Sequence, residues 1–375
     1  MGVSNSLERQ FKVISTGTLK GGVGKSNLIF NLAGMIAEEL LLSKKIIKGL
    51  FDGSKIPEIA QAALLASPYV IGSVEQLLTE NQPANWSQLK TLLRVILTKV
   101  EVSEEIQNEI FASLLVRNRV EELLRQNGQP NRILLLDADP QFNLTNNIGI
   151  DVRQTGLKTA RDIFETDASA SEIIYSSPIK GLPNIDIIPA SLLLTRTEIN
   201  LVSRTGREWL VTNFISDNFS FLNQRYRYIF ADTNPNLYMI NQNVFLAADN
   251  IIIVSDVSYN SISGAEFFMA LWSEIKRPLK KADNFGAIVI NKYDARASKR
   301  AKGFIEYCND PTNEEIAKLL IKENVPLNER LADTETEHLP INILPVKTSS
   351  EKESKEKAMA AYAKVIAELK ERGVL

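Results

Sequence analysis

The sequence predicts an α/β fold, in which a mostly parallel, twisted sheet carries helices on both faces. Short apolar runs rich in β-branched residues alternate with helical patterns along the chain, which is typical of strands joined by crossover helices. Most of these runs are continuously apolar, as expected for strands covered by helices on both sides. A long, additional helical stretch in the first half of the chain adds an α-helical insertion to this fold.

Seven strands are predicted from the short apolar runs. They are Phe11–Thr16, Arg132–Asp137, Ile185–Ile188, Tyr226–Asp232, Asn250–Ser255, Phe285–Asn291 and Ile341–Val346. The first helix is expected at about Lys25–Leu42, and the last at Glu356–Arg372. The last helix is amphipathic, and its polar face mixes acidic with basic residues. We therefore expect it to dock on the core rather than to anchor the chain to a membrane.

The segment between the first helix and the second strand is too long for a simple crossover. Such a connection normally needs one helix and two loops of about 2–6 residues each. Residues 44–130 are therefore predicted to be a helical insertion or subdomain, and residues 1–43 and 131–375 the core. Apolar residues recur at three- and four-residue spacings throughout the insertion. This periodicity reports burial, so a structural cap and a docking surface for a partner both stay open.

Composition excludes several classes of protein and site. Hydrophobic residues make up 44% of the chain and charged residues 23%, which is ordinary for a folded protein. The net charge is −2, so any nucleic-acid binding must come from a local basic patch. Cys308 is the one cysteine and His338 the one histidine. Disulfide frameworks, four-cysteine metal or iron–sulfur sites, histidine-based metal sites and a Ser-His-Asp triad are therefore not expected.

Targeting signals are not evident in the sequence. The first ten residues, MGVSNSLERQ, lack the apolar core of a signal peptide. The apolar runs are too short to span a bilayer. We therefore expect a cytoplasmic protein.

The strongest chemical motif lies between the first strand and the first helix. Gly17–Ser26 reads GTLKGGVGKS, which is a P-loop. Its glycines let backbone amides approach phosphate oxygens closely, and the start of the helix adds free amides and a positive end. Lys25 is expected to neutralise the β- and γ-phosphates, and the Ser26 hydroxyl to bind Mg²⁺.

Two later strands end in carboxylates. The run ILLLDADPQ places Asp137 and Asp139 at the carboxyl edge of the sheet, and YRYIFADTNPN places Asp232 there. Because the carboxyl ends of parallel strands form one edge, these side chains are expected beside the P-loop. Asp232 is predicted to be a Walker B-like carboxylate that holds Mg²⁺ through water.

Lys20 makes the glycine loop more specific. With it the loop reads KGGVGKS, which resembles the deviant Walker A motif of the ParA/MinD superfamily. The DADPQFN and ADTNPN boxes and a middle segment ending in IPA also resemble that family. The resemblance covers about Phe11–Leu42 and Arg132–Glu371, leaves the insertion unmatched, and is nearest to the short, Soj-like partition ATPases. In the second and third boxes, Phe142 stands where the family commonly has glycine and Asn234 where it often has proline.

The resemblance implies an ATPase that forms an ATP sandwich dimer. Lys20 would reach the phosphates of the partner's ATP, Asp139 would orient the attacking water, and Asp137 would lie near Mg²⁺ or its water shell. The implied catalytic residues are Lys20, Lys25 and Asp139, and the implied metal-binding residues are Ser26, Asp137 and Asp232. The implied nucleotide-binding residues are Lys20, Gly21, Gly22, Val23, Gly24, Lys25, Ser26, Asn27 and Asn291.

The segment FGAIVINKYD, residues Phe285–Asp294, does not decide whether the nucleotide base is adenine or guanine. N-K-x-D after a strand is the guanine-reading motif of many GTPases, so Asp294 keeps GTP as an alternative. In the ParA-like family the asparagine at this strand end, Asn291 here, contacts adenine. We favour ATP because Lys20 belongs to the ATP-using branch.

The resemblance also implies partners. They are an ATP-dependent second copy of the chain, a ParB-like adaptor protein and non-specifically bound DNA, with nucleoid association and no membrane. Candidate DNA-binding residues are Lys292, Arg296, Lys299, Arg300 and Lys302, and a second basic group comprises Lys347, Lys352, Lys355 and Lys357. Cargo such as a plasmid, chromosome or carboxysome is not distinguished. A MinD-like membrane switch and a metabolic ligase or GTPase of the same fold remain alternatives, whereas a nitrogenase-like reductase lacks the cysteines it needs.

Overall fold

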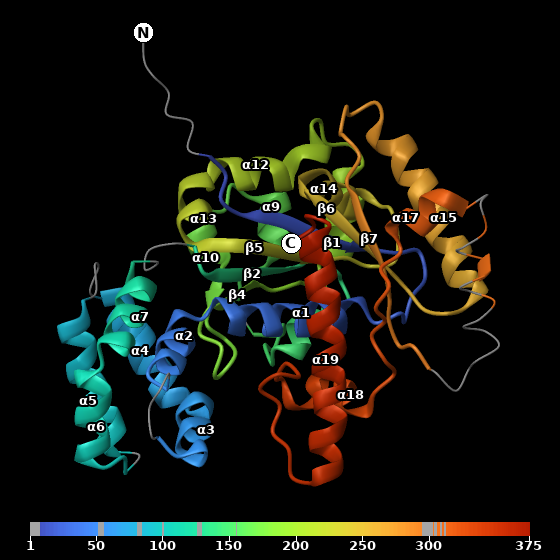
Figure 1. Cartoon of the computed structure of the whole chain (residues 1–375). Helices are drawn as coiled ribbons and strands as arrows, with labels where there is room; N and C mark the ends of the chain where they lie inside the picture. Colours follow the sequence, from blue (N-terminus) through green and yellow to red (C-terminus); the bar gives the residue numbers. More distant parts are fainter. Residues whose placement is uncertain are drawn as a thin grey trace.

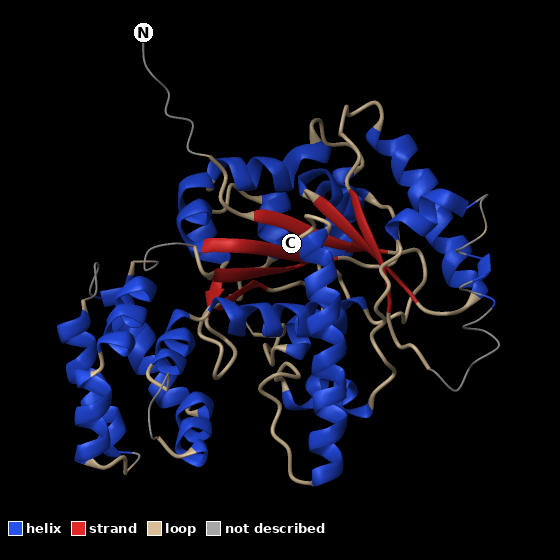
Figure 2. Ribbon diagram, viewed as in Figure 1, coloured by secondary structure: helices blue, strands red, loops and turns tan. Residues whose placement is uncertain are grey.

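Seven strands form one twisted sheet with helices on both faces (Figures 1 and 2). The computed structural model describes residues 8–51, 56–80, 85–99, 101–125, 130–154, 156–294, 303, 306–307, 310 and 313–375. The strand order is β3-β4-β2-β5-β1-β6-β7, and every pairing is parallel except that of β3 with β4. The strands are β1 Lys12–Gly17, β2 Arg132–Asp137, β3 Tyr175–Ser176, β4 Ile185–Ile188, β5 Tyr226–Asp232, β6 Asn250–Ser255 and β7 Phe285–Ile290. The predicted fold class is confirmed.

The first six predicted strands are present, each within one residue of its predicted bounds. The seventh, Ile341–Val346, is wrong, because this segment forms turns and irregular backbone. Its polar groups are satisfied by the first helix instead. The amide of Ile341 donates to Asn31 Oδ1 at 2.7 Å, and Asn342 Nδ2 donates to the Gly34 carbonyl at 3.1 Å. The apolar run is therefore buried against a helix rather than paired in the sheet.

The helices of the core lie on the two faces of the sheet. The first helix of the chain is α1 Lys25–Leu40, and the last three are α17 Glu314–Leu319, α18 Glu329–Glu337 and α19 Ser349–Glu371. The middle of the chain contributes α8 Asn143–Asn147, α9 Ala160–Glu165, α10 Ala170–Ile173, α11 Leu194–Leu201, η1 Arg207–Trp209, α12 Leu210–Asp217, α13 Phe219–Arg225, α14 Met239–Ala247 and α15 Tyr259–Lys276. One buried cluster contains α1 and α19 residues, and a second contains residues of α9, α12, α14 and α15.

The last helix docks on the core, as predicted. Its apolar side chains Tyr362, Val365, Ile366 and Leu369 are fully buried, and α19 packs on α1 and α18 (Figure 1). Within the part of the chain that the structure describes, no helix combines the length and the apolarity needed to cross a membrane.

Between α1 and β2 the chain forms a compact group of helices beside one end of α1 (Figure 1). These are α2 Leu42–Gly49, α3 Glu58–Ala66, α4 Pro68–Glu80, α5 Trp86–Lys99, α6 Glu104–Ala112 and α7 Leu114–Leu124. Their buried residues belong to the same apolar cluster as those of α1 and α19. A partly buried carboxylate joins two of these helices, because Glu75 Oε1 accepts from the amide and the hydroxyl of Ser43 at 3.2 and 2.8 Å.

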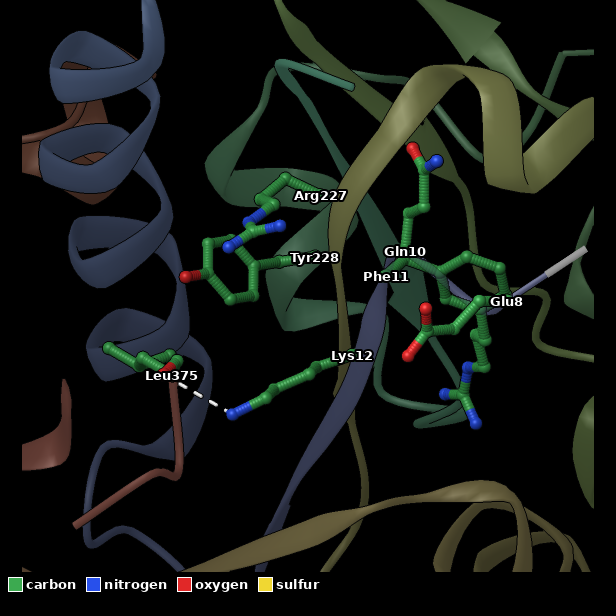
Figure 3. Close-up of a pocket in the computed structure, with 8 residues that line it drawn as sticks. Glu8, Gln10, Phe11, Lys12, Arg227, Tyr228 and Leu375 are labelled. Atoms are coloured by element: carbon green, nitrogen blue, oxygen red, sulfur yellow. Dashed lines mark hydrogen bonds between the residues drawn. The ribbon is translucent and has the colours of Figure 1, made fainter. Parts of the chain in front are cut away.

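Residues 8–12 and the C-terminal Leu375 lie close together at the edge of the sheet where β1 and β5 begin (Figure 3). A cavity of about 410 Å³ lies there, lined by Glu8, Arg9, Gln10, Phe11, Lys12, Arg227, Tyr228 and Leu375. In Figure 3 the ammonium of Lys12 points to Leu375, and it donates to the carbonyl oxygens of Gly373 and Leu375 at 2.6 and 3.3 Å. The opposite edge, where the parallel strands end, carries the predicted phosphate site.

Candidate nucleotide-binding site

The loop between β1 and α1 has the backbone geometry of a phosphate cradle. Gly22 and Gly24 adopt φ of 77° and 84°, a region that residues with a Cβ rarely enter. At Gly24 a side chain is also excluded by space, since a Cβ there would lie 2.6 Å from Asn291 Nδ2. Helix α1 begins directly after Gly24, whose carbonyl accepts from the amide of Leu28 at 2.9 Å. The free amides at the start of α1 therefore face the loop.

Lys25 is a largely buried residue at this loop. Its side chain lies in the interior, with 7% of the residue exposed. Burial lowers its pKa, and the negative charges of Asp232 and Asp139 oppose that shift only in part. Within the described part of the chain, this ammonium makes no hydrogen bond or ion pair. A buried cation without a direct partner is costly, and a phosphate anion would supply the missing partner.

Asp232 is the carboxylate that ends β5. Its Oδ1 accepts from the Thr16 hydroxyl at 3.2 Å, and its Oδ2 is buried without a hydrogen-bond partner among the described residues. Burial raises its pKa, while Lys25 and a hydrogen bond from Ser26 lower it. Asp232 and Ser26 thus bring a carboxylate and a hydroxyl together beside Lys25.

Asp137 and Asp139 have different surroundings. Asp137 is opposite Asp232 in the register of β2 and β5. Its Oδ1 accepts from the Asp139 amide at 3.1 Å, and its Oδ2 accepts from the amide and hydroxyl of Thr145 at 2.8 and 2.7 Å. Both oxygens are therefore engaged in shaping the following loop. Burial raises the pKa of Asp137, and that of Asp139 as well.

The oxygen ligands at this edge suit Mg²⁺. The orphaned Oδ2 of Asp232 and the Ser26 hydroxyl are hard donors, which Mg²⁺ prefers. Within the described ranges, no three His, Cys, Asp or Glu side chains converge as a metal cage. Magnesium at nucleotide sites commonly takes one or two carboxylates and completes its shell with phosphates and water, so the residues present fit. Asp137 fits less well, because its oxygens are already engaged.

Lys20 is bound by side chains from outside the loop. Its ammonium donates to Asp256 Oδ2 at 2.6 Å and to the Ser258 hydroxyl at 2.8 Å. Asp256 directly follows β6, so the carboxyl end of a neighbouring strand holds this lysine. The two lysines of the loop therefore occupy different environments: Lys25 is buried and unpaired, whereas Lys20 is half-exposed and paired.

Of the other two predicted nucleotide-binding side chains, Asn291 contacts the loop and Asn27 does not. Asn291 Nδ2 donates to the carbonyls of Val23 and Gly24. Asn27 turns away from the loop, since its Nδ2 donates to the Leu331 carbonyl at 2.8 Å. Only the backbone of Asn27 is therefore placed to contact a phosphate.

The predicted DNA-binding residues are only partly placed. Lys292 lies at the nucleotide site, where its ammonium donates to the Gly22 carbonyl at 2.9 Å. Arg296, Lys299, Arg300 and Lys302 lie outside the described residues. In the second basic group, Lys347 and Lys352 are exposed, Lys355 is half-buried on the Leu344 carbonyl, and Lys357 pairs with Glu353.

Sequence reasoning missed two features of the site. The first is the pair Asp256 and Ser258, whose distance of more than two hundred residues from Lys20 gives no local signal. The second is the backbone of Phe142, which adopts φ of 47°. The left-handed conformation explains why glycine is common at that position in the resembling family. Phe142 also lines a cavity of about 390 Å³ with Asn146, Gly149, Ile150, Asp151, Val152, Arg153, Leu192 and His338.

The chain is similar in sequence to several known proteins. A family described as AAA domain matches residues 117–284. The sporulation initiation inhibitor protein Soj of Bacillus subtilis is 28% identical over 201 residues, which are 53% of this chain and 75% of Soj. The chromosome partitioning protein ParA of Myxococcus xanthus is 26% identical over 199 residues, or 53% of this chain and 67% of that protein. Two related uncharacterized proteins of Mycobacterium tuberculosis are matched over 50% of their length.

Solved structures share the fold over nearly the whole chain. Cyanothece McdA in complex with ATP has a TM-score of 0.58 and 14% identity, covering 98% of both chains. A plasmid partition protein of Borrelia burgdorferi bound to AMPPNP has a TM-score of 0.51 and 16% identity, covering 94% of this chain and 99% of that one. These structural likenesses show the fold. The sequence likeness to Soj and ParA supports the resemblance to the ParA/MinD superfamily.

Proposed function

We propose that this chain is an ATP-dependent partition or positioning ATPase. In this proposal, ATP and Mg²⁺ bind at the loop between β1 and α1, and two copies of the chain close on each other over the nucleotides. The closed dimer binds DNA without sequence specificity. Hydrolysis, stimulated by a ParB-like adaptor, releases it, so that a cargo such as a plasmid or chromosome is moved or positioned in the cytoplasm.

The observation that carries the proposal is the contrast between the two lysines of the loop. Lys25 is buried beside Asp232 and Asp139 and has no direct partner in the described part of the chain, so it suits the phosphates of the ATP bound to its own chain. Lys20 is half-exposed and held by Asp256 and Ser258. Its ammonium can leave Asp256 and bind a phosphate of the ATP held by a second copy of the chain, with the loss of the Lys20–Asp256 ion pair.

The other residues of the site have separate roles in the proposed phosphoryl transfer. Asp139 is held by the loop beside Lys25, where its carboxylate can orient a water for attack on the γ-phosphate. Ser26 and Asp232 would hold Mg²⁺, which when bound neutralises charge on the phosphates. Asp137 fixes the loop that carries Asp139. No side chain needs to form a covalent bond, because positioning and charge neutralisation supply most of the catalysis in this class of reaction.

The structure also bears on the membrane alternative. An amphipathic membrane anchor must expose its apolar face, whereas the apolar face of α19 is buried on the core. We therefore retain DNA rather than a lipid surface as the binding partner of the ATP-bound state.

The proposed dimer is tested by light scattering with Mg²⁺ and ATP, ADP or no nucleotide. We expect ATP alone to double the mass of the wild type and of Asp139→Ala, which should keep the dimer longer because hydrolysis is slowed. Lys25→Ala should bind no nucleotide. Lys20→Ala should bind ATP and remain monomeric, so a stable ATP dimer of this variant would refute the role given to Lys20.

DNA binding is tested with the same three nucleotide states across a salt series. If four phosphates are neutralised, the affinity of the ATP state should fall about a hundredfold between 50 and 200 mM salt. Affinity that is the same with ATP, ADP and no nucleotide would contradict the proposed switch.

A further inference from the structure

Two side chains that follow β7 hold the phosphate-binding loop from outside. Asn291 Nδ2 donates to the carbonyl oxygens of Val23 and Gly24 at 2.9 and 3.1 Å. Lys292 Nζ donates to the carbonyl oxygen of Gly22 at 2.9 Å. Three successive carbonyls of the loop are thus bound by two neighbouring residues of another strand end.

The orientation of these peptides decides whether the loop can bind phosphate. The C=O and N–H of a trans peptide point in opposite directions. A Gly22 carbonyl held by Lys292 therefore turns the amide of Val23 away from that lysine, to the other side of the loop. Inward amides are what bind phosphate oxygens. Because Gly22 and Gly24 have φ of 77° and 84°, and glycine favours no single orientation by itself, an external partner is needed to select this one.

Lys292 is itself fixed in an unusual conformation. Its φ of 55° is left-handed, a region that long side chains rarely adopt. The backbone on either side is anchored, since the Asn291 amide donates to the Ser255 carbonyl at 2.8 Å and the Tyr293 amide to the Val325 carbonyl at 2.9 Å. A strained residue persists only where its surroundings impose it, and such residues concentrate at functional sites.

We propose that Lys292 is a positioning residue of the phosphate-binding loop, acting through the Gly22 carbonyl to turn the next amide toward the phosphates. This inference rests on the proposed function, because it presupposes that nucleotide binds at this loop. It assigns Lys292 to the nucleotide site rather than to a DNA-binding surface. The amides that it orients serve the phosphates shared by ATP and ADP, so both nucleotides depend on it equally.

The test measures the dissociation constants of fluorescent ATP and ADP, with Mg²⁺, for the wild type, for Lys25→Ala and for four further variants. Lys292→Met removes the charge and keeps the length of the side chain. Lys292→Gly removes the side chain and suits the left-handed backbone, so folding is preserved. Lys292→Arg retains a cationic donor. Lys180→Met is the matched control, because Lys180 is exposed and lies shortly before β4, at the opposite edge of the sheet.

We expect Lys292→Met and Lys292→Gly to bind ATP and ADP about tenfold more weakly, as for the loss of one charge-assisted hydrogen bond. Lys292→Arg should recover most of the affinity, and Lys180→Met should match the wild type. Wild-type affinity in Lys292→Met, or a loss confined to ATP, would overturn the inference, since the latter indicates direct contact with the γ-phosphate. If the wild type and Lys25→Ala bind equally or not at all, the proposed function itself fails.

Discussion

The ammonium of Lys25 is a local source of instability that a ligand can relieve. Its pKa is lowered because the cost of burying the charge exceeds the attraction of Asp232 and Asp139. Without nucleotide, desolvation of the Lys25 charge therefore destabilises the folded chain, and a bound phosphate would compensate for that loss. Active sites are commonly less stable than their surroundings for this reason.

Lys25→Met should consequently separate stability from binding. We expect its melting temperature without nucleotide to equal or exceed that of the wild type, by about 1–4 °C. ATP and Mg²⁺ at a hundred times the dissociation constant should stabilise the wild type by about 2.7 kcal/mol, which corresponds to roughly 3 °C for a chain of this length, and the variant not at all. Thermal unfolding with and without nucleotide measures both quantities. A variant that melts well below the wild type without nucleotide would contradict the unpaired state of this lysine.

The identity of the site residues was predictable from sequence only where the signal is local. Lys25, Ser26 and the carboxylates that end β2 and β5 follow from a glycine loop and from strand ends. The partners that the structure adds to Lys20 and to Gly22 come from segments more than two hundred residues away. Spacing along the chain contains no information on such contacts, so the positions of Asp256 and Lys292 in the site were not predicted.

At the scale of elements, burial explains both why six strands were predicted correctly and why a seventh was predicted wrongly at Ile341–Val346. The parallel strands were predictable because their residues are almost all buried. Strand β3 has two residues, Tyr175 and Ser176, which is too short to give a pattern. The run from Ile341 is equally apolar, but it is buried against α1. Apolar sequence predicts that a segment is buried and does not identify the neighbour.

The contact of that run with α1 requires a glycine. A Cβ on Gly34 would lie 2.8 Å from Asn342 Oδ1 and overlap Pro340, so Gly34→Ala must displace the segment or the helix. We expect a loss of about 1–3 kcal/mol in unfolding free energy, measured by urea denaturation. The matched control is Gly72→Ala in α4, where nothing lies within 4 Å of the added Cβ. This change should stabilise by about 0.5–1 kcal/mol, and equal effects of both variants would contradict the close contact.

The insertion is joined internally by an acid whose protonation affects stability. Burial raises the pKa of Glu75 above its ordinary value of 4.5, and hydrogen bonds from Ser43 and the positive charge of Arg132 oppose the shift only in part. A raised pKa means that the folded chain keeps this proton to higher pH than the unfolded chain. The contribution of Glu75 is therefore complete below about pH 4.5 and is lost as pH rises through the folded-state pKa.

Glu75→Gln keeps an acceptor for Ser43 and cannot ionise. We expect the variant to be more stable than the wild type at pH 7.5, and the difference to shrink at pH 5, in urea unfolding at both values. Glu356→Gln on the exposed side of α19 is the control and should show no such dependence. A glutamine variant less stable than the wild type at pH 7.5 would mean that ionised Glu75 has a stronger partner than Ser43.

At the scale of the whole molecule, one apolar cluster extends from the insertion into the face of the sheet that α1 and α19 cover. The insertion is thus not a separate unit with its own closed core. Its buried residues favour the structural cap among the two roles left open by the sequence, since much of its apolar periodicity is used within that cluster. Leu114 and Leu115 remain exposed, at 71% and 64%, and a partner would have to use such residues.

A shared core predicts that the insertion and the sheet unfold together. Trp86 lies in the insertion, where its ring is 6.0 Å from that of Phe111, and Trp272 is fully buried on the other face of the sheet. Variants that retain only Trp86 or only Trp272, with phenylalanine at the other tryptophan positions, report each region by fluorescence. We expect their urea midpoints to coincide and to shift equally when ATP and Mg²⁺ are added, because coincident transitions define a single cooperative unit. An earlier Trp86 transition that ignores the nucleotide would show instead that the insertion folds and unfolds by itself, which would make its surface available for a partner independently of the ATP state.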